Sequence, residues 1–256
     1  MTPPDAGVGL SVVVPLYNEE GNVVPLFDEL THALRQTTHT YELILIDDGS
    51  TDQTFSRLVA VQSSDPRVRA IRFTRNFGQT AAFAAGFAHA RGRFVVTLDG
   101  DLQNDPADIP RLLTYSGDFD VVCGWRKDRK DSYLTRHLPS VAANYLIGLV
   151  SGIRIHDIGC SLKVFRADIV KRLKLRPGTH RYLPVLASAL GARITEVSVN
   201  HRPRQFGESK YGLSRTFSVI VDLVRLRRMM KETIDPASDI PLLYEIATVI
   251  EQSPQT

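Results

Sequence analysis

Apolar residues in the first half of the chain follow two alternating patterns. Mainly apolar runs of strand length, several of them rich in β-branched residues, occur at residues 10–16, 41–46, 68–73, 93–98 and 120–124. The intervening segments repeat apolar residues at helical spacing and predict helices at residues 22–36, 51–63, 78–91 and after Pro106. Strands that alternate with helices form a mostly parallel sheet with helices on both faces, so the pattern predicts an α/β fold.

The pattern loosens after Gly124. Further helices are expected at residues 139–150, up to Leu173, at 182–190 and at 213–230, with a strand at 193–199. Residues 1–8 are expected to be disordered, and the tail 232–256 to hold one short helix around residues 241–251 with frayed ends. The sequence therefore predicts one folded domain over residues 9–231.

Polar clusters follow three of the predicted strands. They are Tyr17–Asn18–Glu19, Asp47–Asp48 and Asp99–Gly100–Asp101. In an open parallel sheet the carboxyl ends of the strands meet at one edge, and ligands bind there. One acidic cluster is often only a turn, but three at equivalent positions predict a binding site at that edge.

Asp99 and Asp101 are the sharpest candidates for chemistry. Two carboxylates two residues apart, after a buried strand, can converge on one divalent cation, and oxygen ligands select Mg²⁺ or Mn²⁺ rather than zinc. A diphosphate would supply further oxygens. The chain has no Walker loop, no dinucleotide fingerprint after a strand and no zinc-binding spacing. The alternative for this pair is a solvated Asx turn.

Charge adds a second region of interest. The net charge is only +3, but residues 200–231 hold eight Lys or Arg against two acids. Such a stretch suits phosphate, an anionic membrane or nucleic acid, and the alternative is an ordinary solvated helix face. No aromatic stacking platform accompanies it, which argues against nucleic acid.

Composition and apolar runs bear on the compartment. No run reaches the roughly 18–20 apolar residues of a membrane-spanning helix, and no signal peptide is recognisable. We therefore expect a soluble or peripheral protein. Cys123 and Cys160 have no metal-like spacing and are expected to be small apolar packing residues in a reducing compartment.

Five segments carry a family resemblance: VVVPLYNEE, ILIDDGSTDQT, RNFGQTAAFAAG, VTLDGDLQNDP and HRPRQFGESKYG. Together, in this order, they resemble the family 2 glycosyltransferases over residues 9–230. They are most similar to the dolichol-phosphate mannosyltransferase and bacterial polyprenyl-phosphate glycosyltransferase branch. The resemblance implies a GT-A, Rossmann-like fold, inversion at the sugar and a requirement for Mg²⁺ or Mn²⁺. It divides the domain into a nucleotide-sugar half, 9–124, and an acceptor half, 125–231.

The resemblance also implies roles for individual residues. The UDP- or GDP-sugar donor would contact Pro15, Tyr17, Asn18, Glu19, Asp48, Asn76, Gly78 and Asp99, with Asp48 on the base. The metal would be held by Asp99 and Asp101, with Gln103 close by. The catalytic residues would be Asp101, Arg126, Asp157 and Arg202. The acceptor phosphate and the donor diphosphate would be bound by His201, Arg202, Arg204, Ser209 and Lys210.

Asp157 has two readings that depend on the acceptor. A sugar hydroxyl needs a general base in the transition state. A phosphate acceptor is already anionic near neutral pH and can attack without one. With a polyprenyl phosphate as acceptor, Asp157 would orient a neighbouring group or shape the cleft, and a plain loop or capping role is a third reading.

Three hypotheses follow. The leading one is transfer of a sugar to a polyprenyl phosphate for cell-envelope glycan synthesis. The second is transfer to a sugar or polysaccharide hydroxyl, and the third is a catalytically degenerate binding module. For the first, we expect a cytoplasmic protein at the inner face of the plasma membrane, held peripherally or by a membrane partner. The basic amphipathic pattern of residues 213–230 suits either a membrane interface or the core, and a homo-oligomer stays open.

Overall fold

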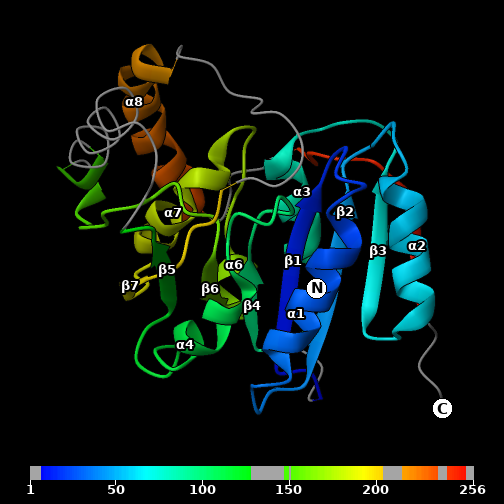
Figure 1. The fold of residues 1–256 in the computed structure, drawn as a ribbon. Helices are drawn as coiled ribbons and strands as arrows, with labels where there is room; N and C mark the ends of the chain where they lie inside the picture. The colour runs from blue at the N-terminus through cyan, green and yellow to red at the C-terminus, as the bar shows by residue number, and fades with distance from the viewer. Residues whose placement is uncertain (1–6, 128–146, 150, 204–214, 236–240, 252–256) are drawn as a thin grey trace.

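The computed structural model describes residues 7–127, 147–149, 151–203, 215–235 and 241–251. Its strands are β1 (Leu10–Leu16), β2 (Tyr41–Asp47), β3 (Val68–Phe73), β4 (Phe94–Thr97), β5 (Val121–Trp125), β6 (Lys163–Arg166), β7 (Ile194–Ser198) and β8 (Ile246–Ile250). They form one sheet in the order β7-β5-β6-β4-β1-β2-β3-β8 (Figure 1). The predicted α/β fold with a mostly parallel sheet is confirmed.

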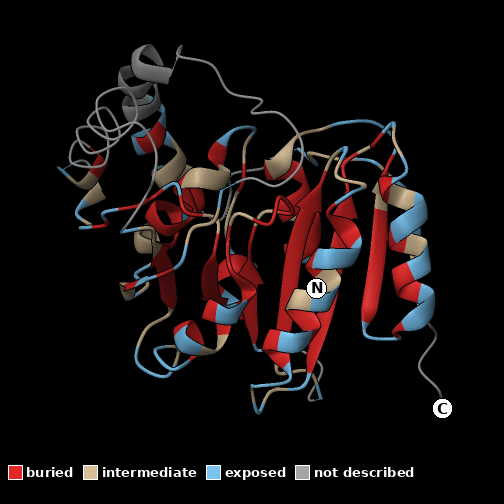
Figure 2. Ribbon diagram, viewed as in Figure 1, coloured by how far each residue is buried: buried red, intermediate tan, exposed pale blue. Residues whose placement is uncertain are grey.

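The centre of the sheet is parallel. β1 pairs in parallel with both β2 and β4, and β2 pairs in parallel with β3. Every residue of β1 and β2 is buried, which explains why both strands are mainly apolar (Figure 2). The carboxyl ends of these strands therefore lie at one edge, as predicted.

Helices cover both faces of the sheet. One layer contains α1 (Val23–Leu34), α2 (Thr54–Ser64) and α4 (Ile109–Leu113), and its core includes Val12 and Val14 of β1. The other contains α3 (Gln79–His89), α6 (Ala167–Val170) and α7 (Leu183–Ala189), and its core includes Val13. This alternation along β1 is the two-residue repeat of a strand buried on both sides.

Short and late helices complete the description. They are the 3₁₀ turns η1 (Pro106–Asp108) and η3 (Thr179–Tyr182), and the helix α8 (Arg215–Ile234). α8 confirms the helix expected at 213–230, and α7 confirms the one expected at 182–190. The helix expected at 139–150 lies almost wholly outside the described residues. Among the helices that the structure describes, none combines the length and hydropathy needed to cross a bilayer.

The tail corrects one prediction. The helix expected around residues 241–251 is wrong, because residues Ile246–Ile250 form a strand that pairs antiparallel with β3. Ile246, Thr248, Val249 and Ile250 are β-branched and favour a strand. The edge of β3 also offers unpaired backbone groups that a helix could not satisfy. Residues Ile246–Ile250 of the tail are therefore part of the sheet.

β6 was not predicted as a strand. It lies between β4 and β5 and is antiparallel to both. Its four residues are too few for a clear apolar pattern, and one of them is the buried Lys163. The two cysteines are free and buried, as expected. Burial raises the pKa of the Cys123 thiol to about 12 and that of Cys160 to about 11, so both stay as neutral packing groups.

Candidate active site

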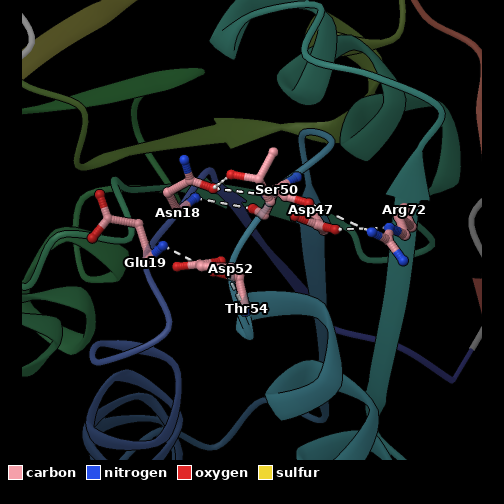
Figure 3. A network of polar contacts seen from close by, with 8 residues as sticks. Asn18, Glu19, Asp47, Ser50, Asp52, Thr54 and Arg72 are labelled. Atoms are coloured by element: carbon pink, nitrogen blue, oxygen red, sulfur yellow. Dashed lines mark hydrogen bonds and ion pairs between the residues drawn. The ribbon is translucent and has the colours of Figure 1, made fainter.

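The loops after β1 and β2 are joined by a network of side-chain to backbone hydrogen bonds (Figure 3). The Asn18 backbone N–H donates to Ser50 Oγ at 2.9 Å, and Thr51 N–H donates to Asn18 Oδ1 at 2.9 Å. The Glu19 N–H donates to Thr54 Oγ1 at 2.9 Å. Asn18 has φ 53°, a left-handed conformation that asparagine tolerates. Asn18 and Glu19, both predicted to contact the sugar donor, thus help to join these two loops.

Asp47 is fully buried at the end of β2. Its Oδ1 accepts from Ser50 N–H at 3.0 Å, and its Oδ2 lies 3.3 Å from Arg72 Nε. The Arg72 guanidinium also lies over the Phe55 ring. Asp47 therefore holds the turn after β2 and fixes the direction of Arg72.

Asp48 joins the β2 end to the start of α3. Its two carboxylate oxygens accept from the backbone N–H groups of Phe77 at 2.7 Å and Gly78 at 2.9 Å. Gly78 has φ 91°, which favours glycine, and it precedes the first residue of α3. The contact of Asp48 with a nucleotide base stays a prediction, while its hold on this loop is observed.

Asp48→Ala is expected to lower the free energy of unfolding by about 3 kcal/mol, because two backbone N–H groups lose a charged acceptor. Asp48→Asn keeps one acceptor oxygen and is expected to lose about half as much. Urea denaturation of the three proteins measures this series. Equal stability of wild type and Asp48→Ala would contradict the structural role.

The loop after β4 brings Asp99 and Asp101 together. Gln79 Nε2 donates to Asp99 Oδ1, and Asp99 N–H donates to Ser161 Oγ at 3.2 Å. The Asp101 carboxylate accepts from Gln103 N–H at 3.1 Å. A Cβ on Gly100 would lie 2.6 Å from the Leu16 side chain, so the loop packs directly on the end of β1. The glycine between the two acids therefore permits their position.

The chemistry of this pair suits a divalent cation. Among the described residues, no group of three or more His, Cys, Asp or Glu side chains is arranged to hold a metal. Burial, followed by the negative charge of Asp101, raises the pKa of Asp99 to about 6. A cation shared by the two carboxylates would offset the repulsion that Asp101 exerts on Asp99, and oxygens from a bound ligand would complete the coordination shell of the cation. The residues fit the expected Mg²⁺ or Mn²⁺.

The raised pKa predicts a pH dependence. An ordinary Asp pKa is 3.8, so between that value and about 6 the folded state binds more protons at Asp99 than the unfolded chain. The contribution of Asp99 to stability is thus full below the lower value and is lost as the pH rises through the higher one. Asp99→Asn, which cannot titrate, is expected to gain stability relative to wild type across this window.

Urea denaturation in metal-free buffer at a series of pH values checks this result. The difference in free energy of unfolding between the two proteins isolates Asp99 from the other carboxylates. A difference that stays constant from about pH 4 to about pH 7 would contradict the raised pKa.

Arg126 and Asp157 form a buried bidentate ion pair. Arg126 Nε donates to Asp157 Oδ2 at 2.7 Å and Arg126 Nη2 donates to Oδ1 at 2.9 Å. The side chains are 13% and 8% exposed. Burial by itself would lower the pKa of Arg126, but the hydrogen bonds and charge of Asp157 outweigh it and raise that pKa. The Asp157 carboxylate therefore orients the guanidinium of Arg126, the residue that directly follows β5.

Several residues of this site were missed by sequence reasoning. Glu196 of β7 accepts from the N–H groups of His156 at 2.7 Å and Asp157 at 3.0 Å, and so fixes the turn that carries Asp157. Lys163 is 2% exposed and donates to the Cys160 carbonyl. With Arg126, its charge acts to lower the pKa of Asp99. In the sequence, the only signal for Glu196 and Lys163 was that each is a charged residue within a mainly apolar run.

The segment after β7 lies beside the loop that carries Asp101. Arg202 N–H donates to the Gln103 carbonyl at 2.8 Å, and His201 forms an isolated β-bridge with Asn104. The Arg202 guanidinium forms ion pairs at 2.7 Å with Glu29 and with Asp105. The backbone of Arg202 is therefore near the candidate metal site. Its guanidinium is paired with one carboxylate on α1 and with another that directly precedes η1. Arg204, Ser209 and Lys210 lie outside the described residues.

A pocket of about 550 Å³ opens beside the first two strand ends. It is lined by Tyr17, by the turn 49–51 after β2, by residues 72–76 at the end of β3, and by Ala247 and Thr248 of β8. Of the predicted donor contacts, Tyr17 and Asn76 line it. Pro15 is buried in β1, and its carbonyl lies close to Gly100.

Comparison with known proteins identifies relatives. A family model described as Glycosyl transferase family 2 matches residues 11–174. The dodecaprenyl-phosphate galacturonate synthase of Rhizobium johnstonii is 45% identical over 238 residues, covering 91% of this chain and 70% of that protein. The undecaprenyl-phosphate 4-deoxy-4-formamido-L-arabinose transferase of Salmonella choleraesuis is 39% identical over 217 residues, covering 84% of this chain and 66% of that protein.

Solved structures share the fold at lower identity. Glucosyl-3-phosphoglycerate synthase from Mycobacterium tuberculosis in complex with UDP has a TM-score of 0.64 and 22% identity, covering 87% of this chain and 81% of that chain. The same enzyme with Mn²⁺, UDP and glucosyl-3-phosphoglycerate has a TM-score of 0.58 and 20% identity, covering 90% and 79%. At this identity the likeness concerns the fold alone.

Proposed function

Because the chain belongs to glycosyl transferase family 2 and has the GT-A fold, we propose that it transfers a sugar from a nucleoside diphosphate donor to a polyprenyl phosphate. The names of the two relatives above, a dodecaprenyl-phosphate galacturonate synthase and an undecaprenyl-phosphate 4-deoxy-4-formamido-L-arabinose transferase, each join a polyprenyl phosphate to a sugar. The proposal includes a UDP- or GDP-sugar donor, inversion at the sugar carbon, and a peripheral position at the membrane surface where such a lipid is found.

The observation that carries the acceptor proposal is the Arg126–Asp157 pair. A general base must be able to take a proton from the acceptor. Asp157 instead accepts two hydrogen bonds from a buried guanidinium and one from the Arg126 backbone N–H at 3.2 Å. Both carboxylate oxygens of Asp157 are thus occupied by Arg126, and a phosphate acceptor does not need a general base. The geometry therefore favours a phosphate over a sugar hydroxyl.

The residues then divide the work. Asp99 and Asp101 would hold Mg²⁺ or Mn²⁺, which supplies charge neutralisation for the diphosphate leaving group. Mn²⁺ accompanies UDP in the M. tuberculosis synthase structure, which shares the fold. Arg126, oriented by Asp157, offers its remaining N–H groups to a phosphate oxygen. Preorganised cations of this kind offset the repulsion between two approaching anions.

Incubation of the purified protein with Mn²⁺, a short-chain polyprenyl phosphate and a panel of UDP- and GDP-sugars, including galacturonate, tests the proposal. The expected result is a lipid-linked sugar that appears with one donor and disappears with EDTA. The free polyprenol, which has a hydroxyl and no phosphate, is the matched control acceptor. Product on polyprenol or on a free sugar, with none on any lipid phosphate, would overturn the acceptor assignment.

A further inference from the structure

The C-terminal strand β8 is fixed to the sheet at both of its ends. Before it, the Tyr244 ring stacks on Phe73 at a centroid distance of 5.2 Å, and Thr74 N–H donates to the Glu245 carbonyl at 3.0 Å. After it, the Glu251 carboxylate lies 2.5 Å from Nε of the buried Arg69. A stacked ring at one end and a partly buried ion pair at the other hold the strand against β3.

The pairing of β8 with β3 is irregular at one point. Thr248 lies opposite Arg72 and Ile246 opposite Phe73, with the irregularity between Arg72 and Phe73. Ala247 is therefore the extra residue of a β-bulge, which bends a strand and redirects its side chains. The irregularity lies at the carboxyl end of β3, and this is where Ala247 and Thr248 line the 550 Å³ pocket.

The other walls of this pocket come from residues on the nucleotide-sugar half of the domain. Tyr17, Thr51 and Asn76 are among the lining residues, and their side chains carry a ring, a hydroxyl and an amide. A Cβ on Gly49 would lie 2.3 Å from the Arg75 backbone, so the turn after β2 and the end of β3 already touch. An aromatic ring with amide and hydroxyl groups around it suits a nucleobase and its ribose, and the volume falls within the usual range of small-molecule pockets.

We infer that β8 forms the outer wall of the nucleoside pocket and that Thr248 limits and contacts the nucleoside of the donor. This inference rests on the proposed function, because it requires a nucleoside diphosphate ligand. In the β3–β8 register Thr248 and Arg72 share one face of the sheet, and Arg72 is held in place by Asp47. The segment beyond the family match, which ends at residue 174, thereby takes part in donor recognition.

Thr248→Phe tests this inference without removing the strand. Thr248 is exposed and phenylalanine favours strands, so the variant is expected to fold. The phenylalanine ring is expected to fill the pocket. Val249→Phe is the matched control, because Val249 pairs with Ile71 and its side chain points to the opposite face. Thr248→Val replaces the hydroxyl with a methyl group of similar size.

Isothermal titration with Mn²⁺ measures the affinity of each variant for UDP, GDP and inorganic diphosphate. Thr248→Phe is expected to weaken binding of the nucleotide that wild type prefers by about thirtyfold, and Thr248→Val by about threefold to tenfold. Val249→Phe is expected to match wild type. All variants should bind inorganic diphosphate equally, because it lacks the nucleoside.

Three results would overturn the inference. Unchanged nucleotide affinity in Thr248→Phe, with wild type still binding nucleotide, would remove β8 from the pocket and leave the proposed function intact. Equal loss of inorganic diphosphate would show that the substitution acts on the diphosphate site or the fold. Failure of wild type to bind any nucleoside diphosphate would overturn the proposed function together with this inference.

Discussion

Asp101→Asn is expected to lower the rate of sugar transfer about a thousandfold, because a divalent cation contributes several kcal/mol of charge stabilisation and each 1.4 kcal/mol is about tenfold in rate. The asparagine keeps an oxygen for the Gln103 N–H, so the loop should persist. Removing the negative charge beside Asp99 should also lower the pKa of Asp99 from its raised value.

Three measurements separate these effects. Transfer assays give the rate, titration of UDP with and without Mn²⁺ gives the metal-dependent part of donor affinity, and urea denaturation gives the stability. Asp118→Asn, at an exposed position, removes the same charge elsewhere and should leave all three unchanged. Metal-dependent UDP binding that survives in Asp101→Asn would refute the assignment of Asp101 as a ligand.

Asp157→Leu and Arg126→Met are each expected to lower the free energy of unfolding by about 3 kcal/mol, because each leaves the other charge buried without its partner. The double variant removes both charges and should regain most of that stability. Its transfer rate should stay about a hundredfold below wild type, because the cation proposed to meet a phosphate is gone.

The diagnostic result is a double variant that regains stability while its transfer rate stays low. A purely structural ion pair would let the double variant regain its activity together with its stability. Arg126→Lys is the companion variant, because it keeps the charge but loses the bidentate geometry with Asp157. It should fall between wild type and Arg126→Met in both stability and rate. A double variant as active as wild type would rule out a phosphate contact by Arg126.

The main features of the fold followed from local pattern. Runs such as 10–16 and 41–46 are mainly apolar because both faces of these strands are covered. The helical spacing between the runs predicts helices that connect parallel strands. Strand polarity then sends the residues after each strand to one edge. The placement of the Tyr17, Asp48 and Asp99 regions at one edge of the sheet could therefore be predicted before any coordinates.

The tertiary structure alone decided which residues distant along the chain contact one another. Asp157 and Arg126 are 31 residues apart, and Glu196 is 39 residues from Asp157, so no spacing rule reveals that they meet. The tail forms a strand because the open edge of β3 satisfies its backbone, although its residues were predicted to be helical. By itself the sequence determined which residues lie at the edge formed by the carboxyl ends of the parallel strands. Packing determined which charges are paired there and that residue 248 lines the pocket, because both depend on contacts between elements.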